Sequence, residues 1–134
     1  MVCIYCLSKT GIVNSRHLAR SNQTWRRRQC LKCKALMTTL EEANYSGLWM
    51  VAKDKNIKPF DRDKLFLSIY DSLKHRKTAI SDANGITSTI IAKLAKNCSD
   101  GRIEHQKLID ITTSCLKNFD KPALVHYQAY YCPK

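Results

Sequence analysis

The sequence predicts an α+β protein in which a small cysteine-rich module precedes a β-hairpin and a bundle of about four helices. Two Cys-x-x-Cys pairs occur within the first 33 residues, where apolar residues are too scattered to form a core. A short strand-like segment follows, and the rest of the chain carries apolar residues at helical spacing. These observations divide the 134 residues into two predicted domains, 1–45 and 46–134.

The paired cysteines of the N-terminal module have the spacing of a tetrahedral metal site. Two residues between the members of a pair allow a tight turn that directs both sulfurs at one ion. Thiolates favour zinc over hard cations, although iron in a rubredoxin-like site has the same ligands. Four thiolates leave no position for a catalytic water, so we expect one structural Zn²⁺ per chain. The predicted ligands are Cys3, Cys6, Cys30 and Cys33.

Cysteine usage also indicates the compartment. The chain has seven cysteines, and we find no signal peptide and no apolar run of the ~18 residues that a membrane helix needs. An odd number of cysteines without an export signal favours a reducing compartment, where paired cysteines bind metal. We therefore expect a cytoplasmic protein with no membrane partner. Three further cysteines form no motif and are expected to be buried thiols or surface residues: Cys98, Cys115 and Cys132.

The charge of the chain indicates a polyanionic partner such as nucleic acid, the alternative being a solvated lysine-rich surface. The net charge is +12, and residues 1–42 hold eight basic residues against two acidic ones, which is half of the excess in less than a third of the chain. Arginine forks suit phosphate oxygens and guanine edges, and alternate residues of a strand share one face. Trp25 is expected to pack against the module. The predicted DNA-binding residues are Arg16, Arg26, Arg27 and Arg28.

The second domain is predicted to begin with a β-hairpin. Residues 48–53 form the expected first strand, residues 54–56 the turn, and residues 57–58 a short return strand that Pro59 closes.

Four helices are predicted after the hairpin, over residues 61–76, from residue 81 to a break at residues 98–101, and over residues 104–118 and 120–131. Asp61 and Asp120 are the expected N-caps. Apolar residues predicted to face inward are Leu65, Ile69 and Leu73, then Ile86, Ile90, Ile91 and Leu94, and then Leu108, Ile111, Cys115 and Leu116.

Several motifs occur together in one order. Ser15-Arg16 and the run Arg26-Arg27-Arg28 accompany the cysteine pairs, Thr38-Thr39-x-Glu41 follows, and Pro59-Phe60-Asp61-Arg62-x-Lys64-Leu65 comes after the hairpin. With this combination the sequence resembles the NrdR family, bacterial repressors of ribonucleotide reductase genes, over nearly its whole length. The resemblance implies a zinc ribbon followed by an ATP-cone, in a cytoplasmic, nucleoid-associated protein.

In that family the ATP-cone binds ATP or dATP as allosteric ligands and changes the homo-oligomeric state. The dATP-loaded form favours double-stranded DNA at paired operator boxes. The resemblance places Lys53 and Lys64 at the triphosphate, with Arg62 and Arg76 as further candidates. Val51 and Ile57 are candidates for the adenine pocket, although strand residues of this type are more often core. No G-x-x-x-x-G-K-[ST] pattern occurs, so we expect ATP to be sensed and not hydrolysed.

The chain departs from the usual family pattern at several positions, and these leave an alternative open. That alternative is a zinc-ribbon nucleic-acid-binding protein with a degenerate, non-switching ATP-cone. An RNA-binding ribbon joined to a protein-interaction bundle is a further alternative, whereas no Cys–His or Ser–His pair stands at a spacing that supports an enzyme. The departures are Asn14, Trp25, Lys34 and Met37 in the ribbon, Lys55, Asn56 and Lys58 in the hairpin, and His126 and Cys132 near the end.

Overall fold

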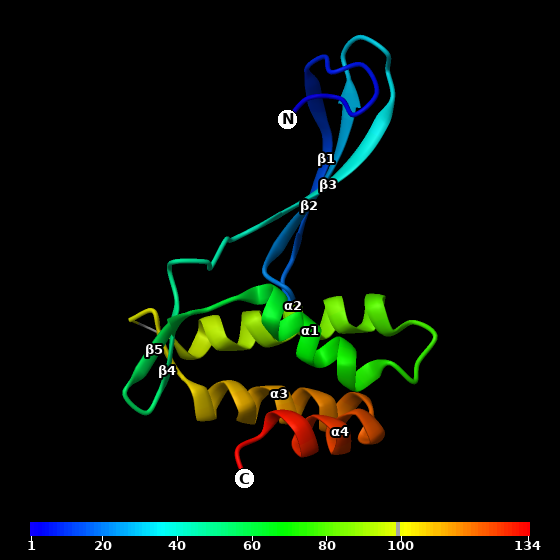
Figure 1. Cartoon of the computed structure of the whole chain (residues 1–134). Helices are drawn as coiled ribbons and strands as arrows, with labels where there is room; N and C mark the ends of the chain where they lie inside the picture. Colours follow the sequence, from blue (N-terminus) through cyan, green and yellow to red (C-terminus); the bar gives the residue numbers. More distant parts are fainter. Residues whose placement is uncertain (99) are drawn as a thin grey trace. The chain divides into compact units, whose positions relative to one another are not determined.

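The computed structural model describes residues 1–98 and 100–134, which form two compact units, Met1–Ala43 and Asn44–Lys134 (Figure 1). Ser99, which the sequence placed in the break between two helices, lies outside the described residues.

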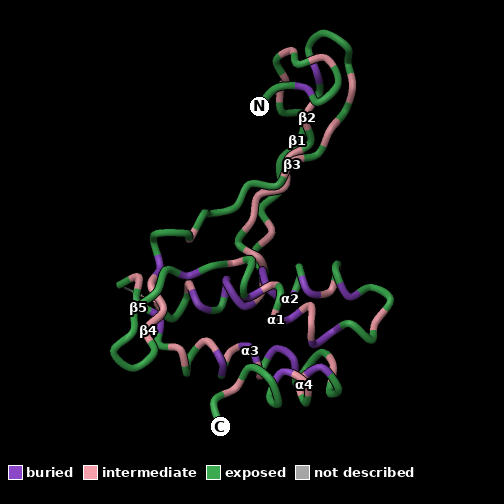
Figure 2. Tube along the Cα trace, in the orientation of Figure 1, coloured by how far each residue is buried: buried purple, intermediate pink, exposed green. Residues whose placement is uncertain are grey.

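The first unit is a three-stranded antiparallel sheet in the order β1-β2-β3 (Figure 1). Its strands are β1 (Thr10–Leu18), β2 (Gln23–Cys30) and β3 (Leu36–Glu42). Among residues 1–43, all of which the structure describes, only Cys3 and Cys30 are buried, and Figure 2 shows the rest of this unit as exposed or half-buried. A sheet with no apolar core depends on another source of stability, such as a bound metal.

The second unit begins with the predicted hairpin, formed by β4 (Met50–Lys53) and β5 (Asn56–Pro59). A third strand, β6 (Arg102–Glu104), pairs in parallel with β4 and gives the sheet order β5-β4-β6. Sequence analysis missed β6 because three residues are too few to show a period of two. Gly101 precedes it with a φ of +74°, and a Cβ there would lie 2.7 Å from the carbonyl oxygen of Leu48. Only glycine fits this approach without strain.

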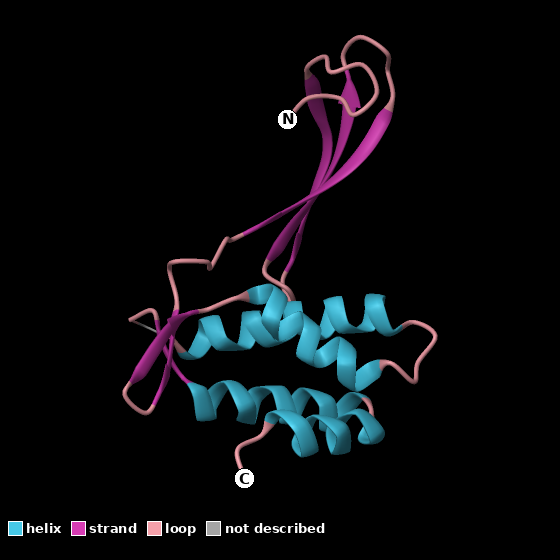
Figure 3. Cartoon of the chain, viewed as in Figure 1, coloured by secondary structure: helices cyan, strands magenta, loops and turns pink. Residues whose placement is uncertain are grey.

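Four helices form a bundle, with the hairpin at one end (Figure 3). They are α1 (Arg62–Leu73), α2 (Ala79–Asn97), α3 (His105–Phe119) and α4 (Lys121–Tyr131). The predicted N-caps are confirmed. A carboxylate oxygen of Asp61 accepts hydrogen bonds from the amides of Asp63 (2.9 Å) and Lys64 (3.2 Å), and Asp120 accepts one from Ala123 (2.9 Å). Such caps satisfy amides that have no partner inside the helix. None of the described helices is long and apolar enough to cross a membrane.

The bundle core follows the predicted apolar spacing in α1 and α2, where the predicted inward residues are buried. In α3 the predicted Cys115 and Leu116 are buried, and Leu108 and Ile111 are partly buried and pack against the core. The prediction missed two further buried residues of this helix, Ile109 and Thr112. Thr112 tolerates burial because its hydroxyl donates a 2.8 Å hydrogen bond to the carbonyl oxygen of Leu108. A hydroxyl satisfied inside its own helix cannot be recognised from apolar spacing.

Candidate functional site

The four paired cysteines meet at one point of the first unit. Their sulfur atoms all lie within 4.8 Å of one another, with Cys3 Sγ 3.7 Å from Cys33 Sγ and Cys6 Sγ 3.4 Å from Cys30 Sγ. Zinc–sulfur bonds of about 2.3 Å place the sulfurs of a regular tetrahedron about 3.8 Å apart. The arrangement therefore fits a tetrahedral Zn²⁺ site.

Each cysteine pair forms the same kind of tight turn. The amide of Leu7 donates to the carbonyl oxygen of Cys3 (3.0 Å), and the amide of Lys34 donates to that of Cys30 (3.2 Å). Leu7 and Lys34 both adopt positive φ, 55° and 62°, directly after the second cysteine of their pair. A non-glycine residue in this conformation costs about 1–2 kcal/mol, so each turn needs compensation from the contacts it creates.

Amide groups in these turns also point at sulfur. The amide of Tyr5 lies 3.4 Å from Cys3 Sγ, and the amides of Lys32 and Cys33 each lie 3.4 Å from Cys30 Sγ. Hydrogen bonds to sulfur favour the thiolate, which is the form that binds metal.

The pKa values of Cys6 and Cys33 are shifted in opposite directions. Backbone and side-chain hydrogen bonds from Ser8 lower the pKa of Cys6 to about 6. For Cys33 the amide of Ala35 lowers the pKa, but Cys30, Cys6, burial and Cys3 together raise it to about 12. Like charges this close cannot all ionise without a cation, so the site becomes fully anionic only around a metal ion.

The predicted DNA-binding arginines lie on the strands of the ribbon, and the strand register divides them between two faces. Arg26 pairs with Ser15 and Thr39, whereas Trp25 pairs with Arg16 and Leu40. Directly opposed residues share a face, and so do residues two apart on one strand. One face therefore carries Arg26 and Arg28, and the other carries Arg16 and Arg27 with Trp25.

The two arginine faces differ in their neighbours. Arg26 forms an ion pair with Glu41, and Nε of Arg28 lies 3.4 Å from the hydroxyl of Thr39. The opposite face carries the half-buried Trp25 beside exposed Leu40, in keeping with a packing role for the indole. Both faces also mix polar and apolar neighbours, since Arg27 pairs with Asn14 and Thr38 whereas Arg28 pairs with Ile12 and Met37. Hydroxyls beside cations suit phosphate oxygens.

In the second unit, two cavities meet at the hairpin end of the bundle. One of about 260 Å³ is lined mainly by apolar and aromatic side chains, including Phe60, Leu65 and Tyr127. The other, of about 420 Å³, is lined by polar residues of the hairpin. Val51, Lys58 and His105 line both cavities, which together form one cleft, hereafter the hairpin cleft.

Hairpin register separates the two residues predicted for an adenine pocket. Val51 pairs with Lys58 and lines both cavities, while Ile57 pairs with Ala52 and lines neither. Because Ile57 is adjacent to Lys58 along β5, its side chain lies on the opposite face of the hairpin. The structure therefore brings Val51 to the cleft and leaves Ile57 outside it.

Lysines concentrate at the hairpin cleft without carboxylate partners. Lys53 and Lys58 line the polar cavity, and Lys58 and Lys64 line the apolar one. Within residues 1–98 and 100–134, none of these three ammonium groups forms an ion pair. Lysines without ion pairs beside an apolar cavity are features that suit a ligand with phosphate and aromatic groups.

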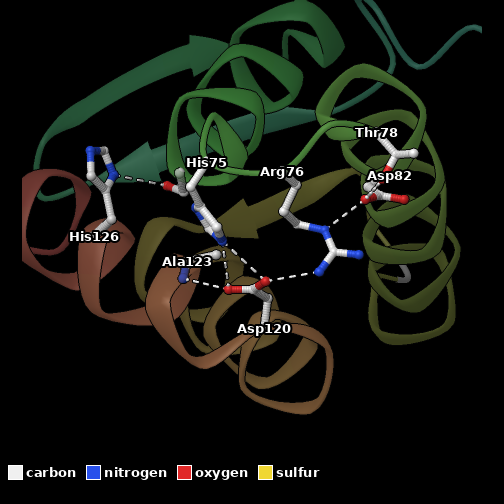
Figure 4. Close-up of polar contacts among 8 residues, drawn as sticks. His75, Arg76, Thr78, Asp82, Asp120, Ala123 and His126 are labelled. Atoms are coloured by element: carbon white, nitrogen blue, oxygen red, sulfur yellow. Dashed lines mark hydrogen bonds and ion pairs between the residues drawn. The ribbon is translucent and has the colours of Figure 1, made fainter.

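Arg62 and Arg76, the other predicted phosphate ligands, line neither cavity. The guanidinium of Arg62 donates a 2.7 Å hydrogen bond to Asn84 on α2. Arg76 connects Asp82 to Asp120, as Figure 4 shows. Both arginines link helices in this structure.

Cleft residues that the sequence did not single out as ligands include Lys58, His105, Tyr127 and Tyr131. The two tyrosines are four residues apart on α4. The sequence predicted a helix over this segment but no binding role for either tyrosine. Burial raises the pKa of Tyr127, and the hydroxyl of Tyr131 donates a 2.9 Å hydrogen bond to Asp71. His105 has no histidine or cysteine at metal-binding spacing, so no sequence signal pointed to it.

A basic ribbon with a four-cysteine metal site, followed in the chain by a hairpin and a helical bundle, is the arrangement expected of a zinc-ribbon transcription regulator. Residues 1–41 match the family described as "Transcriptional repressor NrdR-like, N-terminal domain". The chain is 32% identical over 132 residues to the transcriptional repressor NrdR of Psychrobacter cryohalolentis, covering 98% of this chain and 86% of the relative. The chain belongs to the NrdR family of transcriptional repressors.

Two other relatives match over the same length. The NrdR repressors of Finegoldia magna and Lachnoclostridium phytofermentans are 29% and 26% identical, each over 98% of this chain and 87% and 86% of their own lengths. Their names describe regulators of transcription and not enzymes. Membership of a family of transcriptional repressors implies that this chain binds DNA. Family membership and the cysteine cluster together support zinc as the metal.

Proposed function

We propose that this protein is a nucleotide-sensing repressor that binds paired operator boxes upstream of ribonucleotide reductase genes. ATP and dATP bind to its second unit and change how copies of the chain assemble, and this assembly controls DNA binding. The observation that carries the proposal is the hairpin cleft, in which three lysines without ion pairs line a polar cavity and the adjoining apolar cavity, in a chain of the NrdR family.

The cleft suggests how a nucleotide would bind. The apolar cavity has the lining expected for an adenine ring, with Val51 on one side and Tyr127 on another. The polar cavity, with Lys53 and Lys58, suits the phosphates. Lys64 lines the adjoining cavity together with Lys58 and is assigned to the same triphosphate. Ammonium groups bind polyphosphates as point charges and need no fixed fork geometry.

The first unit supplies the DNA contacts in this proposal. Its zinc, held by Cys3, Cys6, Cys30 and Cys33, keeps the strands in the register that presents the arginines. We assign the direct DNA contacts to Arg26 and Arg28, since the hydroxyls of Ser15 and Thr39 lie on the same face. Arg16 and Arg27 have a secondary role. The unit boundary after Ala43 then separates a DNA-binding zinc ribbon from an ATP-cone.

Nucleotide control requires that ATP and dATP favour different assemblies, because a ligand that binds every state equally shifts none of them. A symmetric oligomer places two ribbons so that each contacts one operator box. Two linked contacts raise affinity by avidity without any change in either ribbon. Repression thus responds to the nucleotide through the assembly alone.

Fluorescence anisotropy on a duplex from the host's ribonucleotide reductase promoter tests the proposal. Binding is measured at one fixed salt concentration without nucleotide, with ATP and with dATP, because DNA affinity depends steeply on salt. Promoter-selective binding that strengthens with dATP and weakens with ATP is the expected result. Equal binding to any duplex, indifferent to nucleotide, would refute it.

One observation favours a second candidate, a zinc-ribbon DNA-binding protein with a non-switching cone. Arg62 and Arg76 connect helices and do not line the cleft, so fewer cations are available to a nucleotide than sequence motifs indicated. Calorimetry, which measures nucleotide binding, and sedimentation, which measures oligomeric state, together separate the two candidates. Nucleotide binding without a change in oligomeric state supports the second.

A further inference from the structure

His105 occupies the junction of the cavities at the hairpin end of the bundle. It is the first residue of α3 and lines both cavities of the hairpin cleft. It also lines a third cavity of about 650 Å³, together with Lys53 and Arg102. The imidazole is half-buried, and among the described residues it forms no hydrogen bond or ion pair. Among the described residues, no hydrogen bond or ion pair therefore accounts for its position.

Basic groups outnumber acidic ones around this imidazole. The hairpin contributes Lys53, Lys58 and Asp54. Lys64 of α1 and its N-cap Asp61 contribute one charge of each sign. The carboxylate of Asp61 is already occupied by the amides at the start of α1.

The remaining neighbours do not reverse this balance. β6 contributes Arg102 and Glu104, one of each sign, and α4 contributes the neutral phenols of Tyr127 and Tyr131. A bound polyphosphate brings several negative charges at once beside His105. The start of α3 adds free amide groups that also favour an anion.

We propose that His105 binds the phosphates of the nucleotide as an imidazolium, so that nucleotide binding is coupled to proton uptake. Histidine is the side chain whose charge changes between about pH 5 and 8, and the anion supplies the reason to take up the proton. The proposal rests on the proposed function, since it assumes that the cleft binds ATP or dATP. It adds a pH-dependent affinity to this repressor.

Isothermal titration calorimetry of the full chain with dATP tests this coupling. Titrations at about pH 6 and pH 8, each in buffers of different ionisation enthalpy, report both affinity and the number of protons taken up. We expect binding to be roughly tenfold tighter at the lower pH, the change that a one-unit shift produces, with net proton uptake. The nucleotide's own titration is common to all variants and cancels in their comparison.

Two substitutions at His105 and one control separate the possibilities. His105→Gln is expected to weaken binding at the lower pH and to abolish the part of proton uptake that depends on this side chain. His105→Lys supplies a permanent cation and should restore tight binding at the higher pH without proton uptake. His75→Gln is the control, because His75 contacts Asp120 and lines none of the three cavities.

The outcomes are distinguishable. Proton uptake that is the same in the wild type and in His105→Gln overturns the role of His105 and leaves the nucleotide site intact. Failure of the folded wild-type protein to bind dATP at either pH refutes the proposed function and this inference with it.

Discussion

Arg76 and Asp120 connect the end of one helix to the start of another: Nη1 of Arg76 donates a 3.0 Å hydrogen bond to Oδ2 of Asp120, the N-cap of α4. The same guanidinium donates through Nε to Asp82 at 2.8 Å (Figure 4). Its centre lies 4.8 Å from the ring centroid of Phe119. One side chain thus joins the loop after α1 to α2 and to α4. Its role in this structure is to hold the bundle together.

Replacing Arg76 with Met should destabilise the second unit without removing a ligand of the hairpin cleft. The side chain of Asp120 is only 9% exposed, so the substitution leaves a nearly buried carboxylate with fewer partners. We expect the midpoint of thermal unfolding to fall by roughly 4–8 °C. Lys77→Met is the matched control, since Lys77 is exposed and is a neighbouring cation. Loss of nucleotide binding in a still-folded Arg76→Met variant would instead indicate direct contact with the phosphate.

The same cluster predicts the acid sensitivity of the bundle. Hydrogen bonds from Thr78 and then from Arg76 lower the pKa of Asp82. Burial would raise the pKa of Asp120, but bonds from Ala123, His75 and Arg76 outweigh it and lower the pKa.

A carboxylate whose pKa is lower in the folded state stabilises the fold at pH values above the unfolded pKa, about 3.9 for Asp. That stabilisation is lost as the pH falls through the lower folded value. The unfolding temperature should therefore drop below about pH 4, and Asp82→Asn should reduce the slope. A slope in Asp82→Asn equal to that of the wild type would contradict this assignment.

Metal removal should unfold the first unit alone. The ribbon buries only Cys3 and Cys30 among its 43 residues, so the zinc site supplies the organisation that a core would otherwise provide. Cys30→Ser is expected to release the metal and to unfold the three strands of the ribbon. In circular dichroism the strand signal should decrease while the helical signal persists. Cys115→Ser, on α3, is the control. A full equivalent of zinc retained by Cys30→Ser would show that the ligand set is wrong.

The division of the arginines predicts which face of the ribbon contacts DNA. The double substitution Arg26→Ala/Arg28→Ala should weaken binding and reduce the slope of log K against log salt by about 1–2, as expected for one or two lost phosphate contacts. The pair Arg16→Ala/Arg27→Ala, on the opposite face, serves as the matched comparison. A larger loss of slope in that second pair would assign the DNA contact to the face of Trp25.

The hairpin lysines predict the strength of nucleotide binding. Lys53→Met should weaken ATP binding roughly 10- to 100-fold, the range that corresponds to about 1.5–3 kcal/mol for hydrogen bonds to a charged group. Lys55→Met is the control, because Lys55 lies in the hairpin turn and lines none of the cavities. Equal affinities of the two variants, measured by calorimetry, would exclude Lys53 from the site.

The sequence by itself determined the parts of this protein that depend on local spacing. Two Cys-x-x-Cys pairs predict the metal centre because a two-residue turn directs both sulfurs inward, and the structure clusters all four. Asp61 and Asp120 predict helix starts because capping needs only neighbours in the chain. The apolar steps of four in α1 and α2 predict their buried faces for the same reason.

Only the tertiary structure decided which of these residues meet. Strand pairing separates Arg26 from Arg27 and Val51 from Ile57, because register assigns adjacent residues to opposite faces. Helix packing directs Arg76 to Asp120, 44 positions away, and brings His105 to a cleft shared with the hairpin. Contacts between distant segments depend on how whole elements pack together, and no local pattern of residues records that packing.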